Sequence, residues 1–186
     1  MKTNGKLIIF IVAFLTLAAN AYAQNPREEL KQLVEQLQQS PNDNVLREKI
    51  IKLAPTLKPS PVLPTEAERR MARGAAAFKG AVSAADYQDA AKEFEQATLS
   101  APWYGDAYFN LGVAQDKAAD YEASLHNLNL ALLASSESKD IKALIYEVEY
   151  RQEKARPEAR AAKQKLMNEA LARSLEGAVF TLQIRL

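Results

Sequence analysis

A pattern of residues that occurs twice between positions 66 and 136 constrains the fold of this chain more than any other feature. The first copy reads RGAAAFK, then a short insert, then DYQDAAKEFEQATLSAP; the second reads AYFNLGVAQDKAADYEASLHNLNLALLAS. The residues that match are Gly74 with Gly112, Lys79 with Lys117, Asp86-Tyr87 with Asp120-Tyr121, Phe94 with Leu128, and Ala97 with Ala131. A repeat of about 34 residues, rich in helix-forming residues, predicts a solenoid of helix–turn–helix units.

The matching residues suit the close packing of antiparallel helices. Small residues such as Gly74 and Gly112 let two helices approach, while Phe94 and Leu128 fill the space between them. Asp86 and Asp120 are expected at the turn inside each unit, where a short acidic side chain can cap the second helix. The glycines are 38 residues apart but the Asp-Tyr pairs only 34. The first copy therefore has a four-residue insert within 80–85, which we expect to lengthen its turn.

These residues resemble the tetratricopeptide repeat. In the second copy the signature positions of that family are taken by Tyr108, Leu111-Gly112, Asp120-Tyr121 and Ala131. In the first copy the segment from Gly74 to Lys79 fits the first helix, and the second helix is matched by Ala90, Phe94, Ala97 and Pro102. The resemblance implies an all-α fold, a TPR-like antiparallel helix–turn–helix solenoid with capping helices. Capping is needed because short repeat arrays expose apolar end faces.

The residues before the repeats are expected to form an N-terminal helical hairpin over 24–54 and a Pro-rich linker over 55–64. Its first helix, about 27–39, has an apolar stripe, and its second, about 44–54, can be capped by Asn42 or Asp43. Four prolines in PTLKPSPVLP exclude a helix and favour a stiff spacer over a recognition ligand. Thr65 and Glu68 have the spacing of a capping box. We expect the hairpin to dock on the repeats and cap the end formed by the first copy, with a separate hairpin as the alternative.

After the repeats, a helix of about 138–155 is expected to shield the last repeat through the apolar stripe Ile141, Leu144, Ile145 and Val148. With it, the repeat unit spans 65–156.

Pro157 is expected to interrupt that helix, leaving a C-terminal helix and apolar tail over 157–186. In the tail, Phe180 to Leu186 alternate apolar and polar residues, which is a strand signal. It could be a frayed tail (the interpretation we favour), a strand added to a partner's sheet, or the start of a further domain.

The first 23 residues are typical of a secretory signal peptide. Lys2 and Lys6 precede a predominantly apolar run from Leu7 to Ala19, and Ala21-Tyr22-Ala23 is a small-x-small cleavage site, which predicts a mature start at Gln24. The run is short for a permanent anchor, and no later run approaches membrane length. We therefore expect a periplasmic or secreted protein without a stable membrane span. With no cysteine in the chain, its stability must come from helix packing.

No residue constellation in the sequence indicates catalysis, a cofactor or a metal. The only histidine, His126, lies where a surface position is expected. Phosphate-binding glycine loops, dinucleotide fingerprints and cysteine pairs are lacking. The carboxylate pairs Glu93-Glu95 and Glu147-Glu149 are two residues apart on predicted helices, and we interpret them as solvated. Removing the signal peptide changes the formal charge from +1 to −1. Such a balanced charge lacks the excess of basic residues that nucleic-acid binding requires.

The resemblance also implies a concave groove, lined by the first helix of each repeat, that binds extended peptides or partner helices. Carried over residue by residue, the second copy contributes Asp106, Phe109, Asn110, Val113, Asp116 and Lys117, and the first contributes Met71, Ala75, Phe78 and Lys79. Asn110 stands where carboxylate-clamping members have an Asn, but Asp116 and Ala75 replace the expected basic partners. The alternative is that Phe109 and Val113 are covered by the chain's own helices. Trp103 and Tyr104 at the inter-repeat turn are interpreted as packing residues, with a hot spot for partner binding as the alternative.

The sequence thus predicts a non-enzymatic, exported tetratricopeptide-like adaptor that binds a protein or peptide partner. The alternative is a self-associating structural component of the cell envelope, a homo-oligomer assembled through the C-terminal helix and tail.

Overall fold

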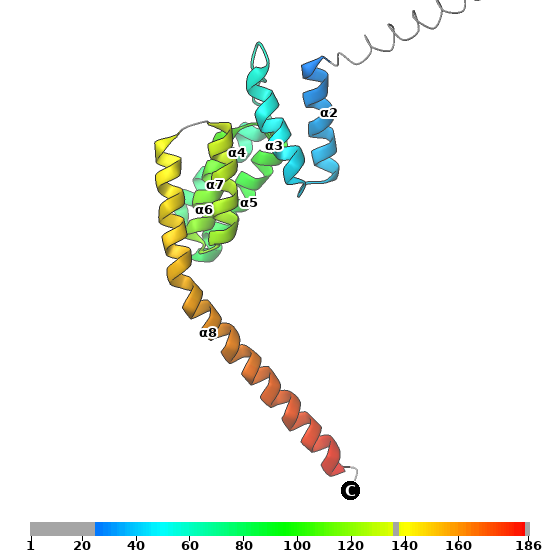
Figure 1. The fold of residues 1–186 in the computed structure, drawn as a ribbon, viewed down its shortest axis with the longest axis vertical. Helices are drawn as coiled ribbons and strands as arrows, with labels where there is room; N and C mark the ends of the chain where they lie inside the picture. The colour runs from blue at the N-terminus through cyan, green and yellow to red at the C-terminus, as the bar shows by residue number, and fades with distance from the viewer. Residues whose placement is uncertain (1–24, 136–137, 185–186) are drawn as a thin grey trace, which may run out of the picture.

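The computed structural model describes residues 25–135 and 138–184, and its regular structure over those residues is entirely helical (Figure 1). The predicted all-α class is therefore confirmed. The elements are α2 (Pro26–Gln39), α3 (Asn44–Leu53), the 3-10 turn η1 (Ala54–Thr56), α4 (Thr65–Gly80), α5 (Ala84–Ser100), α6 (Gly105–Lys117), α7 (Tyr121–Ala134) and α8 (Lys139–Ile184). The predicted signal peptide, 1–23, lies outside the described residues.

Helices α4 to α7 form two antiparallel helix pairs that stack on one another, α4 on α5 and α6 on α7, with α5 against α6. The matched glycines sit where the helices of each pair are closest. A β-carbon on Gly74 would lie 2.6 Å from Cε1 of Phe94, and one on Gly112 would lie 2.8 Å from Cγ of Leu128. The small-against-large pairing predicted from the repeat is thus present in both units.

The extra residues of the first repeat lengthen its helices, and the predicted longer turn is wrong. Both turns consist of three residues, 81–83 and 118–120. The first repeat instead has helices of 16 and 17 residues, compared with 13 and 14 in the second. Alanine-rich sequence around the insert extends the helices at low cost in free energy.

The predicted capping box at Thr65 and Glu68 is also wrong. Pro64 occupies the N-cap position, so Thr65 is already the first helical residue and makes no side-chain cap bond. The reciprocal box lies at the start of α5, where the Asp86 amide donates to Ser83 Oγ and Asp86 Oδ2 accepts from the Ser83 amide at 2.9 Å. Asp120 is the N-cap of α7 as predicted, accepting from the amide of Ala123.

The N-terminal hairpin docks on the repeats, as we expected, but it packs on the second repeat and not on the free end of the first. Ile51 of α3 belongs to the same core cluster as Tyr108 and Leu128, and α3 packs against α7. Trp103, from the turn between the repeats, packs against the hairpin's own cluster, which includes Leu37 and Ile50. The buried guanidinium of Arg47 is joined to the repeats through the hydroxyls of Tyr108 and Thr98. The hairpin therefore caps the repeats instead of standing apart.

Helix α8 has two parts with different surroundings. Its first turns shield α7 as predicted, because Ile141, Ile145 and Val148 are buried in the core cluster with Leu128. Beyond Pro157 it continues as helix to Ile184, bends, and projects away from the repeats (Figure 1). The predicted interruption at Pro157 and the strand signal at the tail are both wrong over the described residues. A proline removes one helical hydrogen bond and bends a helix, but strong helix formers on both sides can continue it.

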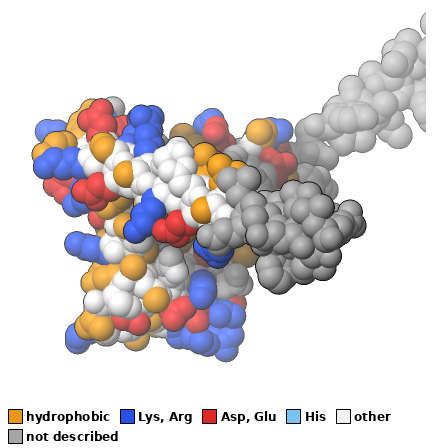
Figure 2. All heavy atoms as spheres, turned by 90° about the horizontal axis from the view of Figure 1, so that it is seen from below, with side chains coloured by type: hydrophobic (Ala, Val, Ile, Leu, Met, Phe, Trp, Pro, Cys, Tyr) orange, Lys and Arg blue, Asp and Glu red, His pale blue; other side chains and the backbone are white. Residues whose placement is uncertain are grey.

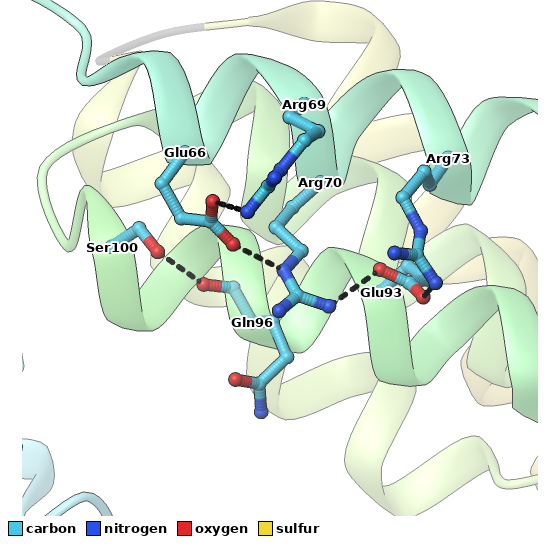
Figure 3. A network of polar contacts seen from close by, with 7 residues as sticks. All are labelled: Glu66, Arg69, Arg70, Arg73, Glu93, Gln96 and Ser100. Carbon is cyan, nitrogen blue, oxygen red and sulfur yellow. Dashed lines mark hydrogen bonds and ion pairs between the residues drawn. The ribbon is translucent and has the colours of Figure 1, made fainter.

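A chain of ion pairs ties α4 to α5 on the outside of the first repeat (Figure 3). Arg70 lies between two carboxylates, with Nε 2.7 Å from Glu66 and Nη1 3.0 Å from Glu93. Glu93 also accepts from Arg73 at 2.7 Å, and its side chain is only 18% exposed. The interpretation of Glu93 as a solvated charge is therefore wrong, because it pairs with two arginines of the neighbouring helix.

Candidate binding groove

An apolar groove lies where α4, α5 and α6 meet. Its volume is about 310 Å³, and it is lined by Ala75, Phe78, Lys79, Phe94, Asn110 and Val113. Positions 75, 78 and 79 share one face of α4, while positions 110 and 113 share one face of α6. The stacking of the two repeats thus brings the first helix of each unit to a common surface, which holds Phe78, Lys79, Asn110 and Val113 of the predicted set.

Packing behind the groove fixes the aromatic side chains that form it. Because Gly74 has no side chain, the ring of Phe94 can lie directly against α4, where it is buried and also reaches the groove. Phe78 meets the ring of Tyr87 edge-to-face, with centroids 5.1 Å apart at 61°. Such pairs hold aromatic rings in a defined orientation. The apolar lining is therefore held in place by the repeat itself.

Two polar side chains border this apolar surface. Lys79, at the end of α4, is exposed, and Asn110 on α6 is half-buried. Among the described residues neither side chain takes part in a hydrogen bond or ion pair, as the observed bonds of α4 and α6 involve other groups. An ammonium group and a carboxamide beside an apolar hollow can bind backbone carbonyls or a carboxylate of a bound segment.

Of the remaining predicted groove residues, Ala75 also lines the groove and the others lie elsewhere. Phe109 packs against the core cluster to which α8 contributes, so the alternative interpretation, burial by the chain's own helix, holds for Phe109. Asp116 is buried, and its Oδ1 lies 3.0 Å from Nε of Arg151 on α8. Asp106 and Lys117 are exposed at the two ends of α6. On the first repeat, Met71 is half-buried against the core cluster of Phe94, whereas Ala75 is exposed and lines the groove.

Sequence reasoning missed Phe94 as a groove residue. The repeat pattern marked it as a packing residue, and it is one, with 3% of its surface exposed. Gly74 could have indicated this role, because a glycine on α4 has no side chain to separate the Phe94 ring of α5 from the groove. The prediction that Trp103 is a packing residue is confirmed by its contact with the hairpin. Tyr104 is half-buried, and burial, followed by the charge of Asp106, raises its pKa.

Surface charge does not single out another large site on the face seen in Figure 2. Basic and acidic side chains are interspersed there with apolar ones, in keeping with the nearly balanced charge of the chain. Within residues 25–135 and 138–184, no group of three His, Cys, Asp or Glu side chains is arranged to hold a metal ion. The helices of the described part include none with the length and apolar character needed to cross a membrane.

Comparison with known proteins gave no match: no family model, no curated protein and no solved structure is similar to this chain at a significant level.

Proposed function

We propose that the mature chain is an exported tetratricopeptide-like adaptor, and that the groove between α4 and α6 binds an extended segment of a partner protein. The observation that carries the proposal is the convergence of Phe78, Lys79, Asn110 and Val113 on one hollow of about 310 Å³. The resemblance to the tetratricopeptide repeat implied all four of these positions. Their meeting at an apolar hollow supports a binding role for that face.

The lining defines the chemistry of the partner segment. A hollow of this volume accommodates one large apolar side chain, with Phe78, Phe94 and Val113 as its apolar surroundings. Lys79 and Asn110 would bind acceptor groups of the segment's backbone or an adjacent acidic side chain. We therefore propose a partner segment with a Leu, Met or aromatic anchor followed or preceded by an acidic residue.

Two features of the sequence support the cellular part of the proposal. The pattern of basic start, apolar run and small-x-small site over 1–23 favours export, and the mature chain has no thiol that an oxidising compartment would modify. The adaptor is accordingly proposed to act in the periplasm or outside the cell, with another exported protein as its partner.

The groove is tested by filling it. Ala75 is exposed on α4 and lines the groove, so Ala75→Trp should fill the hollow without disturbing the core. Ala76→Trp places the same side chain on an exposed neighbouring position that does not line the groove, which makes it the matched control. A random-peptide display library selected on the mature protein supplies the ligand. Selected peptides should share an apolar anchor, bind wild type and Ala76→Trp alike, and lose at least tenfold in affinity for Ala75→Trp. Equal binding to both tryptophan variants would refute the assignment.

One observation favours a second candidate function, self-association. Beyond Pro157, α8 has only exposed side chains over 160–173, and Leu166, Met167 and Leu171 are 65%, 57% and 61% exposed. Helices that leave such residues unpacked commonly pair with another helix. Light scattering separates the two functions. An adaptor is a monomer, whereas a homo-oligomer that is lost on deleting 157–186 would favour the structural role.

A further inference from the structure

A second, polar cavity lies on the other side of the repeats, where the N-terminal hairpin meets them. Its volume is about 210 Å³, and its polar lining includes Arg47, Glu95, Thr98, Gln115, His126 and Asn127. Leu111 and Gln115 of α6 line this cavity, whereas Asn110 and Val113 of the same helix line the apolar groove. At 100° per residue these pairs lie on nearly opposite faces of α6. The two hollows are therefore separate sites.

The guanidinium of Arg47 is the charged group of this cavity. Arg47 is only 8% exposed, and its hydrogen bonds go to neutral groups: Nη1 to the hydroxyl of Tyr108 at 3.2 Å and to Thr98 Oγ1 at 3.5 Å, and Nη2 to the carbonyl of Pro41. Within the described residues no carboxylate lies within 4.0 Å of it. Buried arginines are normally paired with an acid, because an isolated buried charge is costly.

Other donors border the same cavity. Gln115 Oε1 accepts from Asn127 Nδ2 at 2.9 Å, which leaves the Nε2 amide of Gln115 as a donor. His126, the only histidine of the chain, is exposed on α7, as the sequence predicted, and also lines the cavity. Burial lowers the pKa of His126, the charge of Arg47 lowers it further, and Glu48 raises it. The ring is therefore neutral at pH 7 and can donate one hydrogen bond.

The charges around the cavity favour a singly charged anion. Arg47 provides one buried positive charge and His126 is neutral, while the carboxylate of Glu95 stands at the cavity from α5. A phosphate group with two negative charges would meet Glu95, and Arg47 is the only cation among the described residues that line the cavity. A carboxylate has one charge, and its two oxygens match the planar fork of a guanidinium.

We propose that this cavity binds a single carboxylate group, from either the end of a polypeptide or an acidic side chain, with Arg47 as the charged partner and Gln115 and His126 as additional donors. The site is distinct from the apolar groove and does not depend on it. A partner bound there would contact both the hairpin and the repeats.

The lone imidazole of His126 makes the proposal measurable in the full mature protein. Its NMR signal is followed against pH with saturating N-acetylglycine, a blocked chain end, and separately with N-acetylglutamate α-amide, a blocked acidic side chain. Sodium chloride at equal ionic strength is the reference. A carboxylate beside the ring should raise the pKa of His126 by about one unit relative to chloride. The probe that does so identifies the source of the carboxylate.

Gln115→Glu provides the test by variant. The substitution keeps an acceptor for Asn127 and places a carboxylate of the chain itself in the cavity that Arg47 also lines. It should raise the pKa of His126 without any probe and abolish the response to both probes. Gln32→Glu, an exposed position on α2, makes the same change of charge elsewhere and should respond like wild type. An unchanged pKa of His126 with both carboxylates, or a stronger response to inorganic phosphate than to either, would overturn the proposal.

Discussion

Nε of Arg151 on α8 lies 3.0 Å from Oδ1 of Asp116 on α6, and the Asp116 side chain is only 6% exposed. This pair fixes the first part of α8 against the helix that also forms the apolar groove. The position of α8 explains why only part of the predicted binding face of α6 lines the groove. Positions 110 and 113 remain at the groove, while Phe109 and Asp116 are taken up by the chain's own last helix.

Breaking this pair should weaken the protein. Arg151→Ala leaves the carboxylate of Asp116 buried without its cation, and we expect a loss of about 1–2 kcal/mol in the free energy of unfolding, because Arg151 is partly exposed and the pair is partly screened. Urea denaturation measures the loss. Arg156→Ala, on the same helix and without an ion pair among the described residues, should change stability by less than about 0.5 kcal/mol. Equal effects of the two substitutions would show that the pair does not hold α8.

The close contact of α4 with α5 predicts a steric penalty at Gly74. In Gly74→Ala the new methyl group would lie 2.6 Å from the Phe94 ring, and overpacking of this kind costs about 1–3 kcal/mol. Gly80→Ala is the matched control, since a β-carbon there meets nothing within 4 Å. It should be neutral or slightly stabilising because alanine favours the helix. Thermal unfolding of the two variants compares them directly, and a Gly74→Ala protein as stable as wild type would contradict the packing described.

A gain in stability is expected at Ala119. This residue has a φ of 61°, in the left-handed region that favours glycine. It follows α6 in a Schellman-type turn, with its amide bonded to Asp116 O and the amide of Asp120 bonded to Gln115 O, both at 2.9 Å. Ala119→Gly should therefore stabilise the protein by about 0.5–1 kcal/mol. A loss of stability in chemical denaturation would mean that the turn has a different backbone conformation.

The capping box of α5 predicts a pH dependence. Backbone hydrogen bonds from Val82 and Ser83, together with the Ser83 side chain, lower the pKa of Asp86 in the folded protein. Its stabilising effect is therefore complete above the ordinary aspartate pKa and is lost as the pH falls through the lowered value. Asp86→Asn should be less stable than wild type at pH 7, and the difference should shrink below about pH 4. A difference that is independent of pH between 7 and 3 would argue against a charged cap.

Most of the fold could be predicted from the sequence, because the residues that define the repeats recur at regular, short spacings. The Gly74–Phe94 and Gly112–Leu128 pairings, the helical hairpin and the capping stripe on α8 could all be predicted from spacing. The errors arose where one short pattern fits two structures. The alternation after Ala178 is too short to distinguish a strand from a helix, and Pro157 bends α8 without ending it.

The groove was predicted only in part because the sequence gives the face of a helix but not what covers it. Five of its six lining residues were predicted for this face from the sequence, and the sixth is Phe94. The docking of α8 on Asp116 and the place of the buried Phe94 ring behind Gly74, at the back of the groove, depend on tertiary packing. The polar cavity at Arg47 depends on the docked hairpin and brings together residues 79 positions apart, Arg47 and His126, which share no local pattern.

Site-specific photocrosslinking in the source organism tests the central claim, partner binding in the groove, most directly. A photoreactive phenylalanine analogue replaces Ala75 in the groove or, as the control, exposed Ala76 beside it. We predict a discrete crosslinked product with another exported protein from position 75 and little or none from position 76. The same products from both positions, or none from position 75, would contradict the account.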